Sequence, residues 1–323
     1  MNWATSLDST STTWTSVASA ERPATGTILV TGASGFVGRN LVPFLLGRGY
    51  SVRALVRDPA RAPELARSNA DVVVGDLLDA RSLQHACKGI STIIHLAAVA
   101  DSSDERLNHS VNVGGTRRLA DAAVGAGVLR VVNFSSTCAG RQMRDAYGET
   151  KRLAEEELDR CEVQTTHLRP AMIYGTGSKE WDLFVTVVGR LPAVPIPGTG
   201  RSVLRPVYLG DLLDLVHRVL ARDGSVGRTY DVAGPAPVTT GELVELVGQF
   251  QGKRRRIIPL PPGPIVLAAR ILGRLMQRPF VNVDQVMAFL QDTQVDIEPA
   301  RRQLGWDPRP LEEGLAEVFG ERA

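Results

Sequence analysis

The chain has few cysteines, few aromatic residues and no long apolar run. Its 323 residues include three cysteines, and Phe, Trp and Tyr together make up 5%. Cys87, Cys138 and Cys161 show no metal-ligand spacing and cannot all pair with one another, so we expect a reduced, cytoplasmic protein without a metal site. No apolar run is long enough to cross a bilayer, so we expect no transmembrane segment.

An excess of charge of either sign is also missing. Lys and Arg number 37 against 35 Asp and Glu, which leaves a net charge of +2. A chain without a basic excess and with few aromatic side chains is not expected to bind nucleic acid. Hydrophobic residues make up 43%, so the chain can bury one large core and a smaller lobe.

Short apolar runs alternate with helix-like segments from Gly26 onward. The runs that read as strands lie at 28–30, 51–56, 71–74, 92–96, 131–134 and 164–168. Runs that are apolar on both faces are typical of a parallel sheet covered by helices on each side. The sequence therefore predicts an α/β fold with a doubly wound parallel sheet.

The same pattern divides the chain into three parts. Residues 1–25 are rich in Ser, Thr and Ala and show no period, so we expect a poorly ordered extension. We expect a dinucleotide-binding Rossmann domain at 26–175 and, at 176–323, mainly a substrate-binding lobe with some segments returning to the Rossmann domain.

Three glycines follow the first predicted strand at a spacing of Gly-x-x-Gly-x-x-Gly. A strand, a glycine turn and a helix beginning near Phe36 would direct free backbone N–H groups and a helix N-terminus at a pyrophosphate. The first glycine permits the turn, the second lets phosphates approach, and the third lets the helix lie close to its strand. The candidate cofactor-binding residues of this loop are Gly32, Ser34, Gly35, Phe36, Val37 and Gly38.

The end of the second predicted strand bears on the choice of cofactor. An acidic residue there binds the ribose 2′-hydroxyl, whereas an arginine accommodates a 2′-phosphate. Val56 stands at the acidic position and Arg57 follows it, which favours NADP over NAD. In the alternative interpretation, Arg57 is a solvated loop arginine and Asp58 still binds the ribose.

Tyr147 and Lys151 are the candidate catalytic pair. Residues four apart lie on one face of a helix, so the ammonium can stabilise the ionised phenol and lower its pKa. The pair follows a predicted strand that ends in Ser135, Ser136 and Thr137, whose hydroxyls can donate and accept hydrogen bonds to a substrate oxygen. Lys151 would also hold the nicotinamide ribose.

The glycine loop and the Tyr-x-x-x-Lys pair together resemble the extended and atypical branches of the short-chain dehydrogenase/reductase superfamily, the NAD-dependent epimerase/dehydratase family. The resemblance covers roughly 26–319 and implies Thr137, or Ser136 in a shifted register, at the catalytic serine position. It implies a structural role for Asn112, while His95 reads as a packed strand residue. It also implies further cofactor contacts from Asp76, Leu77, Leu96, Ala97, Ala98 and Pro170, although Asp76 could instead cap the following helix.

The sequence does not identify the substrate. The resemblance implies a small-molecule substrate, with nucleotide-sugar epimerase or dehydratase as the first choice and a ketone or 3β-hydroxysteroid-type reductase as the second. It places Arg205 or Arg201 on a substrate diphosphate, although either could be a surface arginine, and a homodimer is also compatible with it. The loop 138–146 is shorter than in most sugar epimerases, which puts the substrate in doubt.

The segment 264–278 departs from the sugar-epimerase pattern. Arg270, Arg274 and Arg278 recur every four residues among apolar side chains. A helix there could lie in a membrane interface or bind a partner, or it could be an ordinary helix of the lobe whose arginines form a solvent-exposed edge. This region also resembles bacterial relatives of the NADPH-binding accessory subunit of respiratory complex I. That likeness implies an alternative, non-catalytic protein in which the dinucleotide is structural.

Overall fold

The computed structural model of the chain describes residues 26–100, 104–142, 144–267 and 290–320. The expected extension at 1–25 and the three arginines of the segment 264–278 lie outside the described residues. Among the residues described, no helix is both long and apolar enough to cross a membrane.

A seven-stranded sheet forms the centre of the molecule, and every neighbouring pair in it is parallel. The six predicted strands are confirmed with small shifts at their ends, and a seventh from the carboxy-terminal half joins one edge. In spatial order the strands are β11 (Arg228–Val232), β6 (Gln164–Pro170), β5 (Arg130–Phe134), β4 (Ile90–His95), β1 (Thr27–Thr31), β2 (Ser51–Val56) and β3 (Asp71–Val74).

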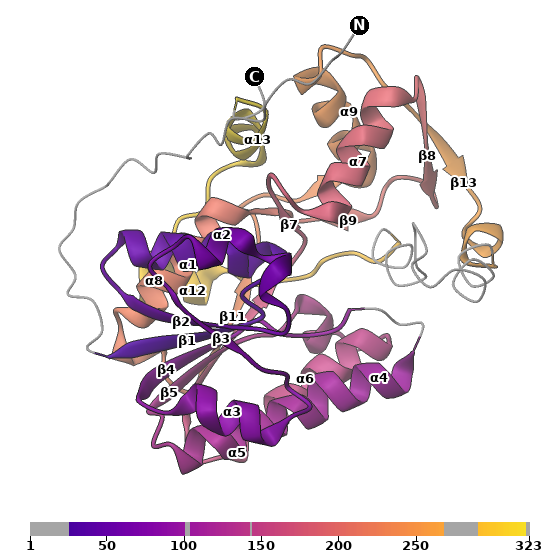
Figure 1. Ribbon diagram of the computed structural model, residues 1–323. Coiled ribbons are helices and arrows are strands. Elements are labelled where there is room, and N and C mark those ends of the chain that lie inside the picture. The colour runs from indigo at the N-terminus through magenta and orange to yellow at the C-terminus, as the bar shows by residue number, and fades with distance from the viewer. Residues whose placement is uncertain (1–25, 101–103, 143, 268–289, 321–323) are drawn as a thin grey trace, which may run out of the picture.

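Helices cover both faces of this sheet (Figure 1). One face packs on α1 (Phe36–Gly47), α8 (Leu209–Leu220) and α12 (Glu298–Leu304) through a core that includes Leu41, Leu212 and Trp306. The other packs on α3 (Ala80–Cys87), α5 (Thr116–Gly125) and α6 (Ala146–Asp159) through Leu83 and Leu119, among others. The doubly wound α/β fold is therefore confirmed: inner strands such as β1 and β5 are buried on both faces, whereas the edge strand β3 is partly exposed.

The strand order places a switch point between β1 and β4. The chain proceeds outward from β1 through β2 to β3 on one side, and from β4 through β5 to β6 on the other. In open parallel sheets, ligands bind in the crevice beyond the carboxyl ends of the strands at such a point. The carboxyl ends of β1 and β4 are where the glycine loop and residues 96–98 lie.

A second body of helices stands apart from the sheet (Figure 1). It contains α7 (Lys179–Arg190), α9 (Thr240–Phe250), α13 (Leu311–Gly320) and the parallel strand pair β8 (Ala193–Pro197) and β13 (Arg256–Leu260). Trp181, Val188, Leu243 and Leu315 lie in its own apolar core. Helix α9 begins at a capping box between Thr239 and Glu242.

Candidate functional site

The glycine loop joins β1 to α1 in a conformation that needs two of its glycines. Gly32 has a φ of 67°, and a Cβ there would lie 2.7 Å from the backbone N of Ala97. A Cβ on Gly38 would lie 2.4 Å from the carbonyl O of Gly32. The loop therefore packs against both the end of β4 and the first turn of α1, which leaves no room for side chains.

The N-terminus of α1 is open to an anion. Its N-cap residue is Gly35, which makes no side-chain capping bond, and no acidic residue occupies the first turn. The first N–H groups of a helix lack intrahelical partners and carry the positive end of the helix dipole. This end of α1 therefore suits a pyrophosphate, as the sequence predicts.

A cavity of about 260 Å³ extends from this loop past the ends of β1, β3 and β4. Most of the residues predicted to bind the cofactor line it, whereas Phe36, Val37 and Gly38 belong to α1. The predicted residues that the cavity brings together are Gly32, Ser34, Gly35, Arg57, Asp76, Leu77, Leu96, Ala97 and Ala98. A glycine cradle beside an open helix N-terminus fits a dinucleotide.

Asp76 lines this cavity beyond β3. Its Oδ1 accepts a hydrogen bond from the N–H of Leu78 at 2.9 Å. The residue that caps α3 is Asp79, whose carboxylate accepts from the N–H of Arg81. The alternative prediction that Asp76 caps the helix is therefore wrong, and its carboxylate stays at the cavity wall.

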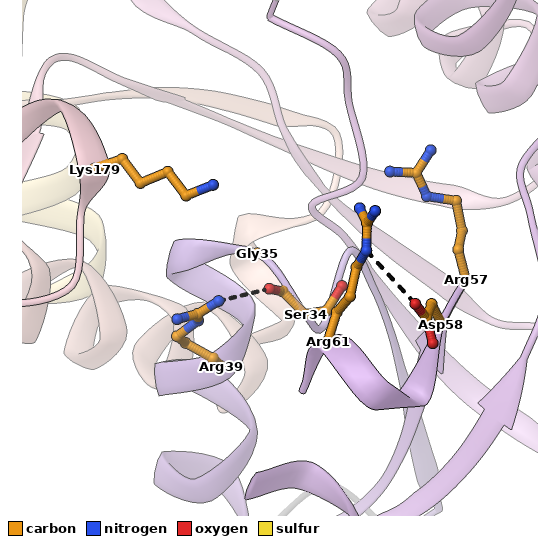
Figure 2. Close-up of a pocket in the computed structure, with 7 residues that line it drawn as sticks. All are labelled: Ser34, Gly35, Arg39, Arg57, Asp58, Arg61 and Lys179. Carbon is orange, nitrogen blue, oxygen red and sulfur yellow. Dashed lines mark hydrogen bonds and ion pairs between the residues drawn. The ribbon is translucent and has the colours of Figure 1, made fainter. Parts of the chain in front are cut away.

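Arg57 and Asp58, which compete for the ribose in the sequence analysis, have different surroundings. The carboxylate of Asp58 accepts from the N–H of Ala60 at the start of the short 3-10 turn η1 (Pro59–Arg61) and pairs with Arg61 at 3.6 Å. The side chain of Arg57 is exposed and has no hydrogen bond or ion pair with any residue that the structure describes. Figure 2 shows Arg57 apart from the Asp58–Arg61 pair.

Tyr147 lies in the first turn of α6, against the 3-10 turn η3 (Thr137–Gly140). Asp145 caps the helix by accepting from the N–H of Gly148 at 2.6 Å. A Cβ on Gly148 would lie 2.8 Å from the carbonyl O of Cys138, so this glycine allows α6 to approach η3 closely. The sequence-predicted Thr137 and Tyr147 therefore lie on two packed elements.

Lys151 follows one turn later and is 3% exposed. Its Nζ donates to the carbonyl O of Phe134, the last residue of β5, at 2.5 Å. Burial lowers the pKa of Lys151 to about 8, and the charge of Glu155 opposes that shift. The ammonium is thus held at the carboxyl end of β5, beside the turn that carries Thr137.

The pKa of Tyr147 differs from the sequence expectation. Burial raises it above the ordinary value for tyrosine, and the nearby Cys138 and Asp145 raise it further. The ammonium of Lys151 is bonded to a backbone carbonyl and is not among the groups that shift the phenol. The lowering expected from a tyrosine and lysine on one helix face is therefore not present in this structure, because desolvation dominates.

The sequence analysis missed a buried ion pair beneath the catalytic residues. The carboxylate of Glu155, 5% exposed, accepts from Nε of Arg169 at 2.9 Å and from its Nη2 at 2.6 Å. This pair joins α6 to β6, the strand that ends at Pro170. The sequence does place both residues beside predicted site residues, since Glu155 stands four residues after Lys151 and Arg169 immediately precedes Pro170. That the two form an ion pair could not be predicted, because it depends on how α6 packs on β6.

Asn112 and His95 have the structural roles that the sequence indicates. The amide of Asn112 accepts from the N–H of Val99 at 2.7 Å and donates to its carbonyl at 2.8 Å. Its nitrogen also donates to Oγ1 of Thr150 in α6 at 3.0 Å, so it braces the loop after β4 against the helix that carries Tyr147.

His95 is buried in β4 between two hydroxyls. Its Nδ1 lies 2.8 Å from Oγ1 of Thr31 and its Nε2 lies 3.0 Å from Oγ1 of Thr116. Burial, and then the charge of Lys151, lowers the pKa of His95 to about 3. The imidazole is therefore neutral and packed, as predicted for a strand residue.

The two arginines expected at a substrate diphosphate lie apart from the cavity. Arg205 donates through Nη1 to the carbonyl of Val295 at 3.1 Å and through Nη2 to the carbonyl of Pro235 at 2.6 Å. Arg201 is exposed. Arg205 therefore ties two segments of the chain together in this structure. Within the described residues, no group of His, Cys, Asp and Glu could hold a metal ion.

Comparison with known proteins gives a match to one family model and to characterised relatives. The model described as "NAD dependent epimerase/dehydratase family" matches residues 28–233. Ceramide reductase of Caulobacter vibrioides is 33% identical, over 92% of this chain and 91% of its own. A 3β-hydroxysteroid dehydrogenase/Δ5→4-isomerase of Mycobacterium tuberculosis is 32% identical, over 88% of this chain and 86% of its own.

Two further similarities bear on the alternatives raised above. A mitochondrial subunit of NADH dehydrogenase from Arabidopsis thaliana, alpha subcomplex subunit 9, is 29% identical, over 82% of this chain and 70% of its own. The solved structure of MoeE5 in complex with UDP-glucose and NAD is 25% identical with a TM-score of 0.72, over 91% of this chain and 98% of that one.

Proposed function

Because the chain belongs to the NAD-dependent epimerase/dehydratase family, we propose that it interconverts a secondary hydroxyl and a ketone on an apolar, lipid-like substrate with NADP(H). The family, the fold and the relatives make it an NAD(P)-dependent enzyme of the extended short-chain dehydrogenase/reductase type. The substrate class, the preference for NADP(H) and the roles of Thr137, Tyr147 and Lys151 are the proposed part.

The contacts of Arg205 are the observation that favours an apolar substrate. In the nucleotide-sugar interpretation, Arg205 or Arg201 would face the substrate diphosphate. In the structure, both terminal nitrogens of Arg205 donate to backbone carbonyls, those of Val295 and Pro235. Releasing them would leave part-buried carbonyls without their charged donor, which costs about 1–3 kcal/mol for each group. An apolar substrate requires no such release.

The names of the relatives support the same choice. The two relatives above 30% identity described here are named for a ceramide and for a steroid, both of which are apolar molecules. The sequence analysis placed nucleotide sugars first and a ketone or steroid-type substrate second. The contacts of Arg205 reverse this order in our proposal.

Each catalytic residue has a role that its position supports. The hydroxyl of Tyr147 gives a proton to the substrate oxygen during reduction and takes it back during oxidation. The hydroxyl of Thr137, on the packed turn η3, holds the same oxygen by a hydrogen bond. Lys151, fixed at the end of β5 by its bond to the carbonyl of Phe134, holds the nicotinamide ribose. When bound, the cofactor supplies or accepts the hydride.

Asn112 and the Glu155–Arg169 pair would keep these groups in place. Asn112 joins the loop after β4 to α6, and the ion pair joins α6 to β6. The helix that carries Tyr147 and Lys151 is thus fixed to strands on both sides of the active site. Such preorganisation matters because small displacements of a reacting group reduce rates strongly.

The test is a substrate panel followed at the nicotinamide absorbance. The wild-type protein should oxidise NADPH in the presence of ketosteroids or long-chain ketones, and Tyr147→Phe should not. A second candidate, nucleotide-sugar epimerase or dehydratase, is favoured by the likeness to MoeE5, so UDP-glucose belongs in the panel together with an assay for its products. Conversion of UDP-glucose without turnover of any ketone would overturn the apolar-substrate proposal.

The non-catalytic alternative makes a different prediction for the same panel. It is supported by the likeness to the NADH dehydrogenase subunit, and it requires no proton-transferring group. A protein that binds NADPH tightly, yet turns over neither ketones nor nucleotide sugars, would favour it.

A further inference from the structure

A second, larger cavity of about 780 Å³ lies beside the glycine loop and is lined mainly by cations. Its walls carry four positive side chains and one carboxylate, which gives a net formal charge of +3. Figure 2 shows these side chains around the opening. The seven lining residues are Ser34, Gly35, Arg39, Arg57, Asp58, Arg61 and Lys179.

This cavity adjoins the dinucleotide cavity, and the two share part of their walls. Ser34, Gly35 and Arg57 line both. In a Rossmann fold the adenosine ribose lies at the end of the second strand, which here is where Arg57 stands. A phosphate on the ribose 2′-oxygen would therefore point past Arg57 into the cationic cavity, whereas an unmodified ribose would leave that cavity without an anion.

The cations of this cavity are poorly neutralised by the protein itself. Asp58 is occupied by Arg61 and by the N–H of Ala60. Among the residues that the structure describes, Arg39 donates to the carbonyl of Ser34, at 3.1 Å, and its buried Nε has no partner. Neither Arg57 nor Lys179 has a side-chain partner within the described part of the chain. Like charges gathered without counter-charges favour an anion between them.

Lys179 reaches this cavity from the second body of helices. It is the first residue of α7, which is capped by Ser178 and anchored in its own core by Trp181, Val185 and Val188. The neighbouring Glu180 lies 3.3 Å from the hydroxyl of Ser178 and does not line the cavity. In Figure 2 the side chain of Lys179 extends from its helix toward the elements that carry Arg39 and Arg61.

We propose that Lys179 is a specificity-determining residue for the 2′-phosphate of NADP(H), acting across the cavity from Arg57, so that this phosphate ties the second body of helices to the sheet. The inference rests on the NADP(H) preference of the proposed function. NADP(H) then bridges α1, η1 and α7, whereas NAD(H) contacts only the sheet side. The cofactor's extra phosphate thereby couples its own binding to the position of the lobe that we expect to receive the substrate.

Two isomeric probes separate a specific phosphate site from general attraction. Adenosine 2′,5′-bisphosphate and adenosine 3′,5′-bisphosphate carry the same charge but differ in the position of one phosphate. In titration calorimetry, the wild-type protein should bind the 2′ isomer more tightly by about tenfold or more, since a charge-assisted contact at this site is lost by the 3′ isomer. Lys179→Gln should weaken the 2′ isomer by about fivefold to tenfold and leave the 3′ isomer nearly unchanged.

Lys88→Gln is the matched control. It removes the same charge from an exposed lysine at the amino end of β4, away from the cavity, and should leave both affinities unchanged. A second readout is hydrogen exchange in residues 179–190. The 2′ isomer should slow exchange there in the wild type but not in Lys179→Gln.

The possible outcomes test the role of Lys179 separately from the preference for NADP(H) on which it rests. If Lys179→Gln weakens both isomers equally, or neither, while Arg57→Ala abolishes the preference, the role of Lys179 is overturned and the NADP(H) preference stands. If the wild type does not discriminate between the isomers, both are overturned, and the hydroxyl–ketone chemistry is then judged separately with NADH.

Discussion

The two ends of the dinucleotide site treat charge in opposite ways. At the catalytic end, Lys151 and Glu155 are buried, and each is bonded to the protein, to the carbonyl of Phe134 and to Arg169. At the phosphate end, Arg57 and Lys179 are exposed and have no side-chain partner among the described residues.

The difference indicates which end of the site has its charges already paired in the folded chain. Buried charges are stable only when the protein itself pairs them, so the catalytic end is organised before any ligand arrives. Exposed cations around a cavity cost little in water and gain most from an incoming anion. The first arrangement suits chemistry, which needs fixed geometry, and the second suits recognition of a charged group.

The largest effect is expected from removing the buried ammonium. Lys151→Met should lower kcat/KM by about ten-thousandfold, because the ribose loses its contact and the cofactor loses the fixed position that the ammonium gives it at the end of β5. Wild-type activity should also decline as pH rises through about 8, where Lys151 loses its proton. Steady-state kinetics with Lys88→Met as the control measures both; activity within tenfold of wild type in Lys151→Met would remove this lysine from the mechanism.

The next effect tests the hydroxyl at the turn η3. Thr137→Val keeps the shape of the side chain but removes its hydrogen bond, and turnover should fall by about a hundredfold or more. Thr137→Ser restores a hydroxyl and should stay within about tenfold of wild type. If the two variants have the same turnover, the hydroxyl of Thr137 does not bind the substrate oxygen, and Ser136 becomes the candidate for that role.

A smaller effect is expected at the phosphate end. Arg57→Ala should weaken NADPH binding by about tenfold to a hundredfold, as expected for the loss of a charge-assisted hydrogen bond, and leave NADH binding unchanged. Arg67→Ala, at an exposed arginine outside the cavity, serves as the control in titration calorimetry. Equal affinity of the wild type for NADPH and NADH would remove the contrast between the two ends.

The smallest effect is a pH dependence of stability that comes from His95. Its pKa is about 3 in the folded protein against 6.5 for an ordinary histidine, so between these values the unfolded state binds a proton that the folded state does not. The contribution of His95 to stability should therefore be lost as pH falls below 6.5, at roughly 1.4 kcal/mol per pH unit. Urea unfolding at several pH values gives the free energy of unfolding as a function of pH, and this dependence should be weaker for His95→Gln than for the wild type. The same pH dependence in both proteins would mean that His95 is not buried in its neutral form.

The sequence predicts the sheet better than the site. Apolar runs identify β1 to β6, most clearly for inner strands such as β5, which is buried on both faces. Gly32 and Gly38 were identified from the spacing of the glycines, and the structure shows that a Cβ at either position would meet the backbone. The strand pair of the second body, β8 with β13, contains three prolines and shows no clear periodicity.

The contacts that the sequence could not supply are those between distant elements. Glu155 meets Arg169 only because α6 packs on β6, and Lys179 lines the cationic cavity only because α7 stands over the glycine loop. Arg205, one of two arginines expected at a substrate diphosphate, instead donates through its terminal nitrogens to carbonyls at residues 235 and 295. The pKa of Tyr147 depends on burial that spacing along a helix does not reveal.

The most direct test of the account measures binding and turnover on the same samples of Tyr147→Phe. Removal of one oxygen from a ring that keeps its packing should leave the fold and the affinity for NADPH unchanged. Reduction of the ketone identified for the wild type should fall by about a hundredfold to ten-thousandfold, as expected for a lost acid–base group. A variant that binds NADPH normally and reduces the ketone at the wild-type rate would contradict the assignment of Tyr147 and the mechanism that depends on it.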